Sequence, residues 1–147
     1  MSDITDIVSE FRTVSTAHSD IETFKYAYPG DINADRNIKY PLVVLSKEHP
    51  YNYSPTFSGK HRIYTLKLFV LDLYQTAEQG TKAPEDKKTE LENYAEQILR
   101  EIVTRSKGTG YTWSLENESV TADHFDRSHN DSLIGVELEF RMNIFTG

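Results

Sequence analysis

The most constraining feature of this sequence is a strict alternation of apolar and polar residues between positions 134 and 144. The apolar residues of one parity are Ile134, Val136, Leu138, Phe140, Met142 and Ile144. Successive side chains of a β-strand point to opposite faces of its sheet, so the pattern predicts a strand with one face on a core. Charged residues of the other parity are predicted to face solvent, a lumen or a neighbouring subunit: Glu137, Glu139 and Arg141.

Two segments have the apolar spacing of amphipathic helices. Over residues 84–106, apolar residues recur three and four positions apart, and Gly108 is a natural C-terminal stop. A second stripe predicts a helix over residues 3–16 with Ser2 as its N-cap. The two stripes consist of Leu91, Tyr94, Ala95, Ile98, Leu99, Ile102 and Val103, and of Ile4, Ile7, Val8, Phe11 and Val14.

The remaining strands are predicted from shorter patterns. Residues 41–45 read as a buried strand, and residues 63–74 are apolar on both parities, as in a central strand covered on both faces. Weaker strand signals cover residues 21–28, 111–115 and 119–125, with a turn at 116–118 between the last two. The order of the elements favours one α+β domain over residues 1–147, with an antiparallel sheet and both helices on one face.

Charge and composition exclude several classes of protein. The formal net charge is −7, from 23 acidic and 16 basic residues, and the basic residues are scattered, which argues against nucleic-acid binding. The absence of cysteine excludes disulfides, thiolate zinc sites and a cysteine nucleophile. No apolar run is long enough to span a bilayer, and Met1-Ser2-Asp3 does not begin a secretory signal. These features favour a protein made in a cytoplasm and independent of membranes.

The sequence contains no recognisable catalytic arrangement. Residues 123–131 concentrate metal-type ligands, but their spacing matches no zinc or calcium loop, and a polar turn is the expected structure. The five histidines stand in polar, turn-like contexts, and Asp72 is expected to accept backbone hydrogen bonds near a strand end. The carboxylates of Glu137 and Glu139 are expected to form a solvated edge. We therefore expect no enzyme, no cofactor and no metal.

The segment 46–60 is rich in proline, serine and asparagine and is predicted to be a long loop. It carries three aromatic residues, Tyr51, Tyr53 and Phe57. Exposed aromatic residues are typical of interface centres, so these side chains are candidates for a contact with another chain. The alternative is that they fold back onto the domain's own sheet, and the sequence leaves both readings open.

Several short motifs occur in a fixed order along nearly the whole chain: Phe24, Gly30-Asp31, Tyr40-Pro41-Leu42-Val43, Phe69-Val70-Leu71-Asp72, the helix at 84–106, and Asp131 with Leu133 and Gly135. In this order they resemble the tail-terminator-like or tail-completion proteins of the bacteriophage neck. The resemblance implies a strongly curved antiparallel sheet with two helices on one face. It also implies a homo-oligomeric ring between the connector and the tail, without enzymatic residues.

The resemblance carries further expectations about partners. They are copies of the same chain and neighbouring neck, connector or tail proteins, while DNA passes through the ring without specific binding. Localisation would be the virion, assembled in the bacterial cytoplasm. Candidate subunit-interface residues are Tyr51, Tyr53, Phe57, Glu137, Glu139 and Arg141. The competing hypothesis is a small ligand-binding or regulatory α+β domain of a bacterial cytoplasm.

Overall fold

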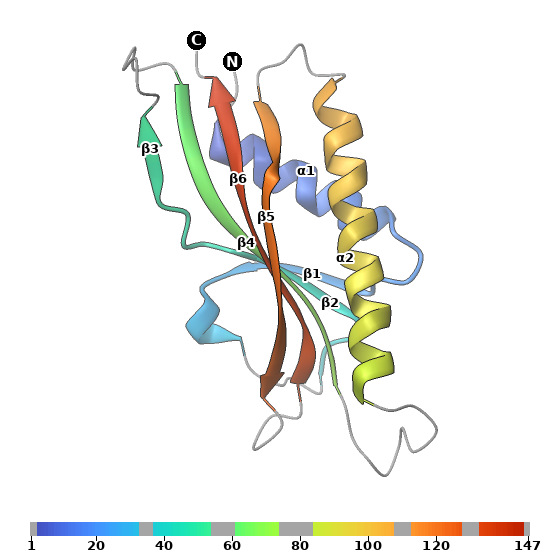
Figure 1. The fold of residues 1–147 in the computed structure, drawn as a ribbon. Helices are drawn as coiled ribbons and strands as arrows, with labels where there is room; N and C mark the ends of the chain where they lie inside the picture. Colours follow the sequence, from blue (N-terminus) through green and yellow to red (C-terminus); the bar gives the residue numbers. More distant parts are fainter. Residues whose placement is uncertain are drawn as a thin grey trace.

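The computed structural model of the chain describes residues 3–32, 37–53, 61–73, 84–107, 113–127 and 133–145. Its elements, in chain order, are α1 (Ile4–Ala17), β1 (Thr23–Ala27), the short 3-10 helix η1 (Pro29–Asp31), β2 (Leu42–Ser46), β3 (Tyr51–Tyr53), β4 (His61–Leu73), α2 (Pro84–Lys107), β5 (Trp113–Arg127) and β6 (Leu133–Phe145). Phe57 and the second half of the aspartate- and histidine-rich segment, 128–131, lie outside the described residues. Both predicted helices are present, which confirms the α+β class (Figure 1).

The N-terminal helix α1 is capped by Asp3 and not by Ser2 as predicted. The Asp3 carboxylate accepts hydrogen bonds from the backbone N–H groups of Thr5 and Asp6, at 2.9 and 3.2 Å. In return, the Asp6 carboxylate accepts the backbone N–H of Asp3 at 2.9 Å. The two acids thus form a reciprocal capping box, which fixes the start of the helix one residue later than the sequence suggested.

The described strands form one open six-stranded sheet. Its order is β1-β2-β4-β6-β5, and β3 pairs with β4 beside this path. The prediction of an antiparallel sheet is wrong for one pair, because β1 and β2 are parallel, whereas the other pairs are antiparallel. Parallel neighbours need a crossover, and the chain makes one between Ala27 and Leu42 through the segment that contains η1. The sheet is therefore mixed.

The third and fifth strands also differ from the sequence-based expectation. Residues 46–60 were expected to form only a loop, but Tyr51–Tyr53 pair with β4 as the strand β3. The two strands expected around residue 117 are one strand, β5, with a register shift between Glu116 and Thr121. Inside the shift, the Ser119 hydroxyl donates to the Glu116 carbonyl at 2.6 Å and accepts the Arg141 N–H at 2.8 Å. These bonds bridge the irregularity and keep the strand continuous.

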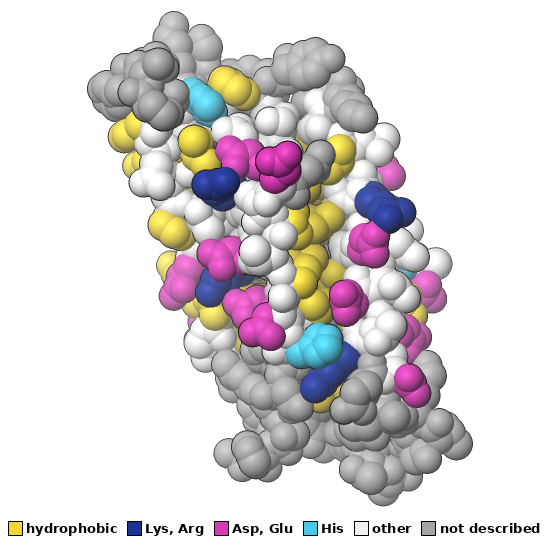
Figure 2. Space-filling model, viewed as in Figure 1, with side chains coloured by type: hydrophobic (Ala, Val, Ile, Leu, Met, Phe, Trp, Pro, Cys, Tyr) yellow, Lys and Arg dark blue, Asp and Glu magenta, His cyan; other side chains and the backbone are white. Residues whose placement is uncertain are grey.

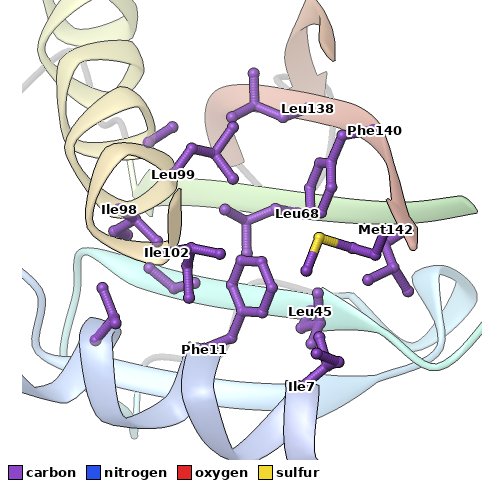
Figure 3. Packing of buried hydrophobic residues seen from close by; sticks show 14 of the residues in the cluster. Ile7, Phe11, Leu45, Leu68, Ile98, Leu99, Ile102, Leu138, Phe140 and Met142 are labelled. Atoms are coloured by element: carbon purple, nitrogen blue, oxygen red, sulfur yellow. The ribbon is translucent and has the colours of Figure 1, made fainter. Parts of the chain in front are cut away.

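Both helices pack on the same face of the sheet, as predicted, and enclose the main core. Figure 3 shows Ile7 and Phe11 of α1 meeting residues from α2, β2, β4 and β6 in this layer. The rings of Phe11 and Phe140 stack with their centroids 5.7 Å apart. Every apolar residue of the predicted β6 parity is buried, namely Ile134, Val136, Leu138, Phe140, Met142 and Ile144, so the strand prediction is confirmed.

A second, smaller core lies on the opposite, helix-free face. It consists of Ile32, Leu42, Val44, Phe69, Leu71 and Leu133. This cluster explains why β2 is buried along its whole length and why the C-terminal half of β4 is apolar on both parities. Gly135 permits the close approach of β6 and β4 there, because a Cβ atom on it would lie 2.0 Å from the Val70 carbonyl oxygen.

Candidate functional site

An open apolar groove runs between α2 and β5 on the helix-covered side of the sheet. Its volume is about 580 Å³. Figure 2 shows it as a strip of hydrophobic side chains between two more polar ridges. The apolar lining comes from α2 with Leu99 and Val103, from β5 with Leu115, Val120 and Ala122, and from β6 with Leu138.

The groove lies beside the part of α2 that is buried against the sheet. The α2 residues Leu91, Ala95, Ile98 and Ile102 are fully buried in the main core. At the edge, β5 presents Ala122 opposite Leu138, and the short alanine side chain is itself exposed. Leu115 and Val120 are only partly buried against the core. The helix and the edge strand therefore leave an apolar channel between them.

Acidic side chains dominate the α2 wall of the groove. Glu92 and Glu96 stand one helical turn apart, and Arg100 follows one turn later and pairs with Glu96. The Nε2 atom of His124, on β5, lies 3.7 Å from the Glu92 carboxylate at one end of the groove. The Arg100–Glu96 pair is solvent-exposed, so it is weak and easily exchanged. The groove therefore suits an apolar partner that carries positive charge.

A second exposed surface lies at the other side of the same sheet face, on β3. Tyr51 and Tyr53 are 46% and 42% exposed, and their rings meet edge to face. The Arg62 guanidinium lies over both rings, 5.2 and 5.7 Å from their centroids. We call Tyr51, Tyr53 and Arg62 the tyrosine patch. The Arg62 guanidinium gives the patch a positive charge, and a hydrogen bond to Tyr64 is the first cause that raises its pKa.

The tyrosine patch continues into a wider aromatic and cationic surface. The Tyr26 hydroxyl lies 2.8 Å from His49 Nε2, and the His49 ring contacts Tyr64 edge to face. Lys47 lies 5.5 and 5.8 Å from the ring centroids of Tyr26 and Tyr28. Burial is the first cause that raises the pKa of Tyr26. The rings of Tyr51 and Tyr53 thus pack on their own subunit yet stay almost half exposed, and their contact with another chain stays a prediction.

The charged β6 residues lie on the helix-free face, as their parity predicted. Glu137 pairs with Lys67 at 3.3 Å, and Arg141 pairs with Glu116 at 2.9 Å. Glu139 lies between them and is exposed. Two of the three candidate interface residues are therefore engaged within the subunit, and a contact of this face with another chain stays a prediction.

The residues with metal-type side chains are dispersed. Residues 123–127 belong to β5, so the expected polar turn does not begin there. His61 and His124 also lie on strands, and the prediction of turn-like surroundings is wrong for both. His61 stacks on Phe145 and lies 2.8 Å from the Asn143 side-chain oxygen. Within the described ranges, no group of three or more acidic or histidine side chains is arranged to hold a metal.

Asp72 has the structural surroundings that the sequence suggested, with one addition. Its carboxylate accepts the backbone N–H of Leu73 at 2.7 Å, near the end of β4. It also pairs with Lys87 of α2 at 2.8 Å, in a largely buried position. This ion pair ties the start of α2 to the sheet.

No family model matches this chain, and no curated protein matches its sequence significantly. No described helix is long and apolar enough to cross a membrane. The function of the chain must therefore be inferred from its exposed surfaces, above all the groove and the tyrosine patch.

Sequence reasoning identified the tyrosines but missed the groove. The groove depends on the distance between α2 and the edge strand, which no local pattern encodes. Two signals were nevertheless present. Leu99 and Val103 widen the apolar stripe of α2 on one side, and Val120 and Ala122 offer small or branched apolar side chains on the strand that faces it.

Proposed function

We propose that this chain is a structural subunit of a bacteriophage neck or tail, and that copies of it close into a ring at the head–tail junction. The observation that carries the proposal is a pair of unlike exposed surfaces at opposite sides of one sheet. The tyrosine patch lies on β3 and the start of β4, and the groove lies beside the edge strand β5. A contact between two different surfaces is head-to-tail, and repetition of such a contact produces rings when the rotation closes.

The helix-free face suits the lumen of such a ring. Its described acids, Glu116, Asp123, Glu137 and Glu139, outnumber the cations Lys25, Lys67 and Arg141. A negative surface repels the phosphates of DNA, so DNA passes without being held. A strong curvature of the antiparallel strands β4, β6 and β5 would direct this face inward. The role is structural, in the virion, and involves no catalysis.

The proposal is tested on particles of the phage whose genome encodes this chain. Mass spectrometry of purified tailed particles should detect the chain at a few copies per particle. A nonsense mutation in its gene should leave filled heads and tails that fail to join, and wild-type protein supplied from a plasmid should restore joined particles. Absence of the chain from purified particles, or normal particles from the mutant, would contradict the proposal.

The groove also favours a second candidate function, a ligand-binding or regulatory domain of a bacterial cytoplasm. Its volume, about 580 Å³, is that of pockets that hold small molecules. The carboxylates of Glu92 and Glu96 would select a neutral or cationic apolar ligand. Native mass spectrometry of protein purified from its host distinguishes the two candidates, because a resident ligand adds a fixed mass that is lost when Ala122→Trp fills the groove.

A further inference from the structure

We propose that the groove between α2 and β5 is the docking site for the tyrosine patch of the next copy of the chain. This inference rests on the proposed ring and specifies which two surfaces form its repeated contact. The tyrosine patch is Tyr51, Tyr53 and Arg62, and the receiving surface is the apolar floor with its acidic α2 wall.

The two surfaces are matched in their apolar character. The groove offers an open floor of aliphatic side chains, and the patch offers two adjacent rings that are almost half exposed. Tyrosine is well suited to such a contact, because its ring is a large apolar surface that ends in a hydroxyl able to form a hydrogen bond. The groove has polar groups beside its floor, in Thr104 and Glu96.

The two surfaces are also matched in charge. The patch carries the Arg62 guanidinium, and Lys47 lies over the adjoining tyrosines. The groove wall carries Glu92 and Glu96, and Glu96 pairs with the exposed Arg100. An exposed pair of this kind contributes little stability, so Glu96 can exchange Arg100 for an incoming guanidinium at small cost. A guanidinium also binds a carboxylate through two parallel hydrogen bonds.

The sheet topology allows the same contact to repeat from copy to copy. Tyr51 pairs with Tyr64 and Ala122 pairs with Leu138, so the patch and the groove lie on the same, helix-covered face. They lie at opposite sides of the sheet, so one copy presents its patch to one neighbour and its groove to the other. Because β3 is antiparallel to β4, β4 to β6 and β6 to β5, a neighbour's β3 placed beside β5 continues the antiparallel order.

The absence of cysteine from the chain allows a direct test by disulfide crosslinking. Two single-cysteine variants, Tyr53→Cys and Ala122→Cys, are mixed in equal amounts at a concentration where copies associate, oxidised, and separated without reductant. The matched control replaces Ala122→Cys by Thr121→Cys. Thr121 is the adjacent residue of β5 and is also exposed, but it pairs with Glu139 and therefore lies on the helix-free face.

We expect a covalent heterodimer from Tyr53→Cys with Ala122→Cys, at least several-fold more than from Tyr53→Cys with Thr121→Cys. Any of three results would overturn the proposed contact: equal yields from the two mixtures, no crosslink in either, or a dominant Ala122→Cys homodimer. Circular dichroism of each variant verifies that the mixed chains are folded. If the chain is found in tailed particles but the pair does not crosslink, the ring function stands and this contact fails. If the pair crosslinks but particles lack the chain, the contact stands and the phage function fails.

Discussion

At the scale of single residues, Gly135 controls how closely β6 approaches β4. A methyl group there would overlap the Val70 carbonyl oxygen, so the two central strands would have to separate. We expect Gly135→Ala to lower the free energy of unfolding by about 1–3 kcal/mol, measured by urea denaturation. The control is Gly30→Ala, where no atom lies within 4 Å of the new methyl group and no comparable loss is expected. Equal stability of the two variants would contradict the packing described.

A substitution of Leu138 tests which face of β6 points toward the helices. It pairs with Leu68 and Ala122 on the helix-covered face and is almost fully buried. Leu138→Asp would place an unpaired charge in the main core, and we expect a loss of at least about 3 kcal/mol, seen as an insoluble or unfolded chain. Glu139→Ala, one residue further along and exposed, should melt normally. A soluble Leu138→Asp variant with normal melting would mean that the strand faces the other way.

At the scale of elements, prediction succeeded where one period persists along the chain. The alternation from Ile134 to Ile144 and the helical stripe of α2 both survive in the structure. The prediction failed for β5 because the residues that face the helices change from odd to even numbers within the strand. Leu115 faces the helices before the bulge and Ala122 faces them after it, so the intervening polar residues resembled a turn.

Pairing direction could not be read from the sequence either. The alternation of Phe24 and Tyr26 correctly indicated β1, but a strand's own pattern does not state whether its neighbour runs parallel. The crossover between Ala27 and Leu42 decides that direction. The strand β3 was missed because three residues are too few to establish a period.

The ion pair between Lys87 and Asp72 is expected to hold the first turns of α2 on the sheet. Their side chains are only 15% and 13% exposed, so removing the cation leaves a largely buried carboxylate without its partner. We expect Lys87→Met to lower the free energy of unfolding by about 2 kcal/mol, measured by urea denaturation. Arg100→Met breaks an exposed pair on the same helix and should cost less than about 0.5 kcal/mol. Similar losses for both variants would argue against a special role for the buried pair.

The cap of α1 should make a pH-dependent contribution to stability. Hydrogen bonds, first from the Thr5 side chain, lower the pKa of Asp3 below its ordinary value of 3.8. Because the pKa of Asp3 is lower in the folded chain, the cap stabilises the helix fully at pH values above the ordinary pKa. This stabilisation is lost as the pH falls through the pKa of the folded state. Asparagine caps helices without titrating. The melting temperature of Asp3→Asn should therefore fall less than that of the wild type between neutral pH and about pH 3. An identical pH profile of the two proteins would contradict this role of Asp3.

At the scale of the whole molecule, the two candidate surfaces differ in how far the sequence could reveal them. Tyr51 and Tyr53 stood out as exposed aromatic residues because their neighbours are polar and turn-forming. The groove is a product of tertiary packing, since Leu99, Ala122 and Leu138 come from three separate elements. The relation between the surfaces follows from the strand order, which only the folded structure supplies.

The tyrosine patch should be needed for assembly and not for folding. Tyr51 and Tyr53 are almost half exposed, so the double variant Tyr51→Ser, Tyr53→Ser removes little buried area. We expect it to lose about 1 kcal/mol of stability, stay soluble, and fail to enter tailed particles. The control Phe145→Ser removes an exposed ring that stacks on His61, on the helix-free face, and should leave assembly intact.

Two outcomes of this experiment would contradict the role of the patch, and each points elsewhere. A loss of several kcal/mol in the double variant would mean that the rings belong to the domain's own core. Normal folding with normal incorporation would mean that copies meet through other surfaces, such as the charged helix-free face. If the double variant fails to assemble and Phe145→Ser assembles normally, the subunit contact lies on β3. The comparison is decisive because the two variants remove exposed aromatic rings from opposite faces of the sheet.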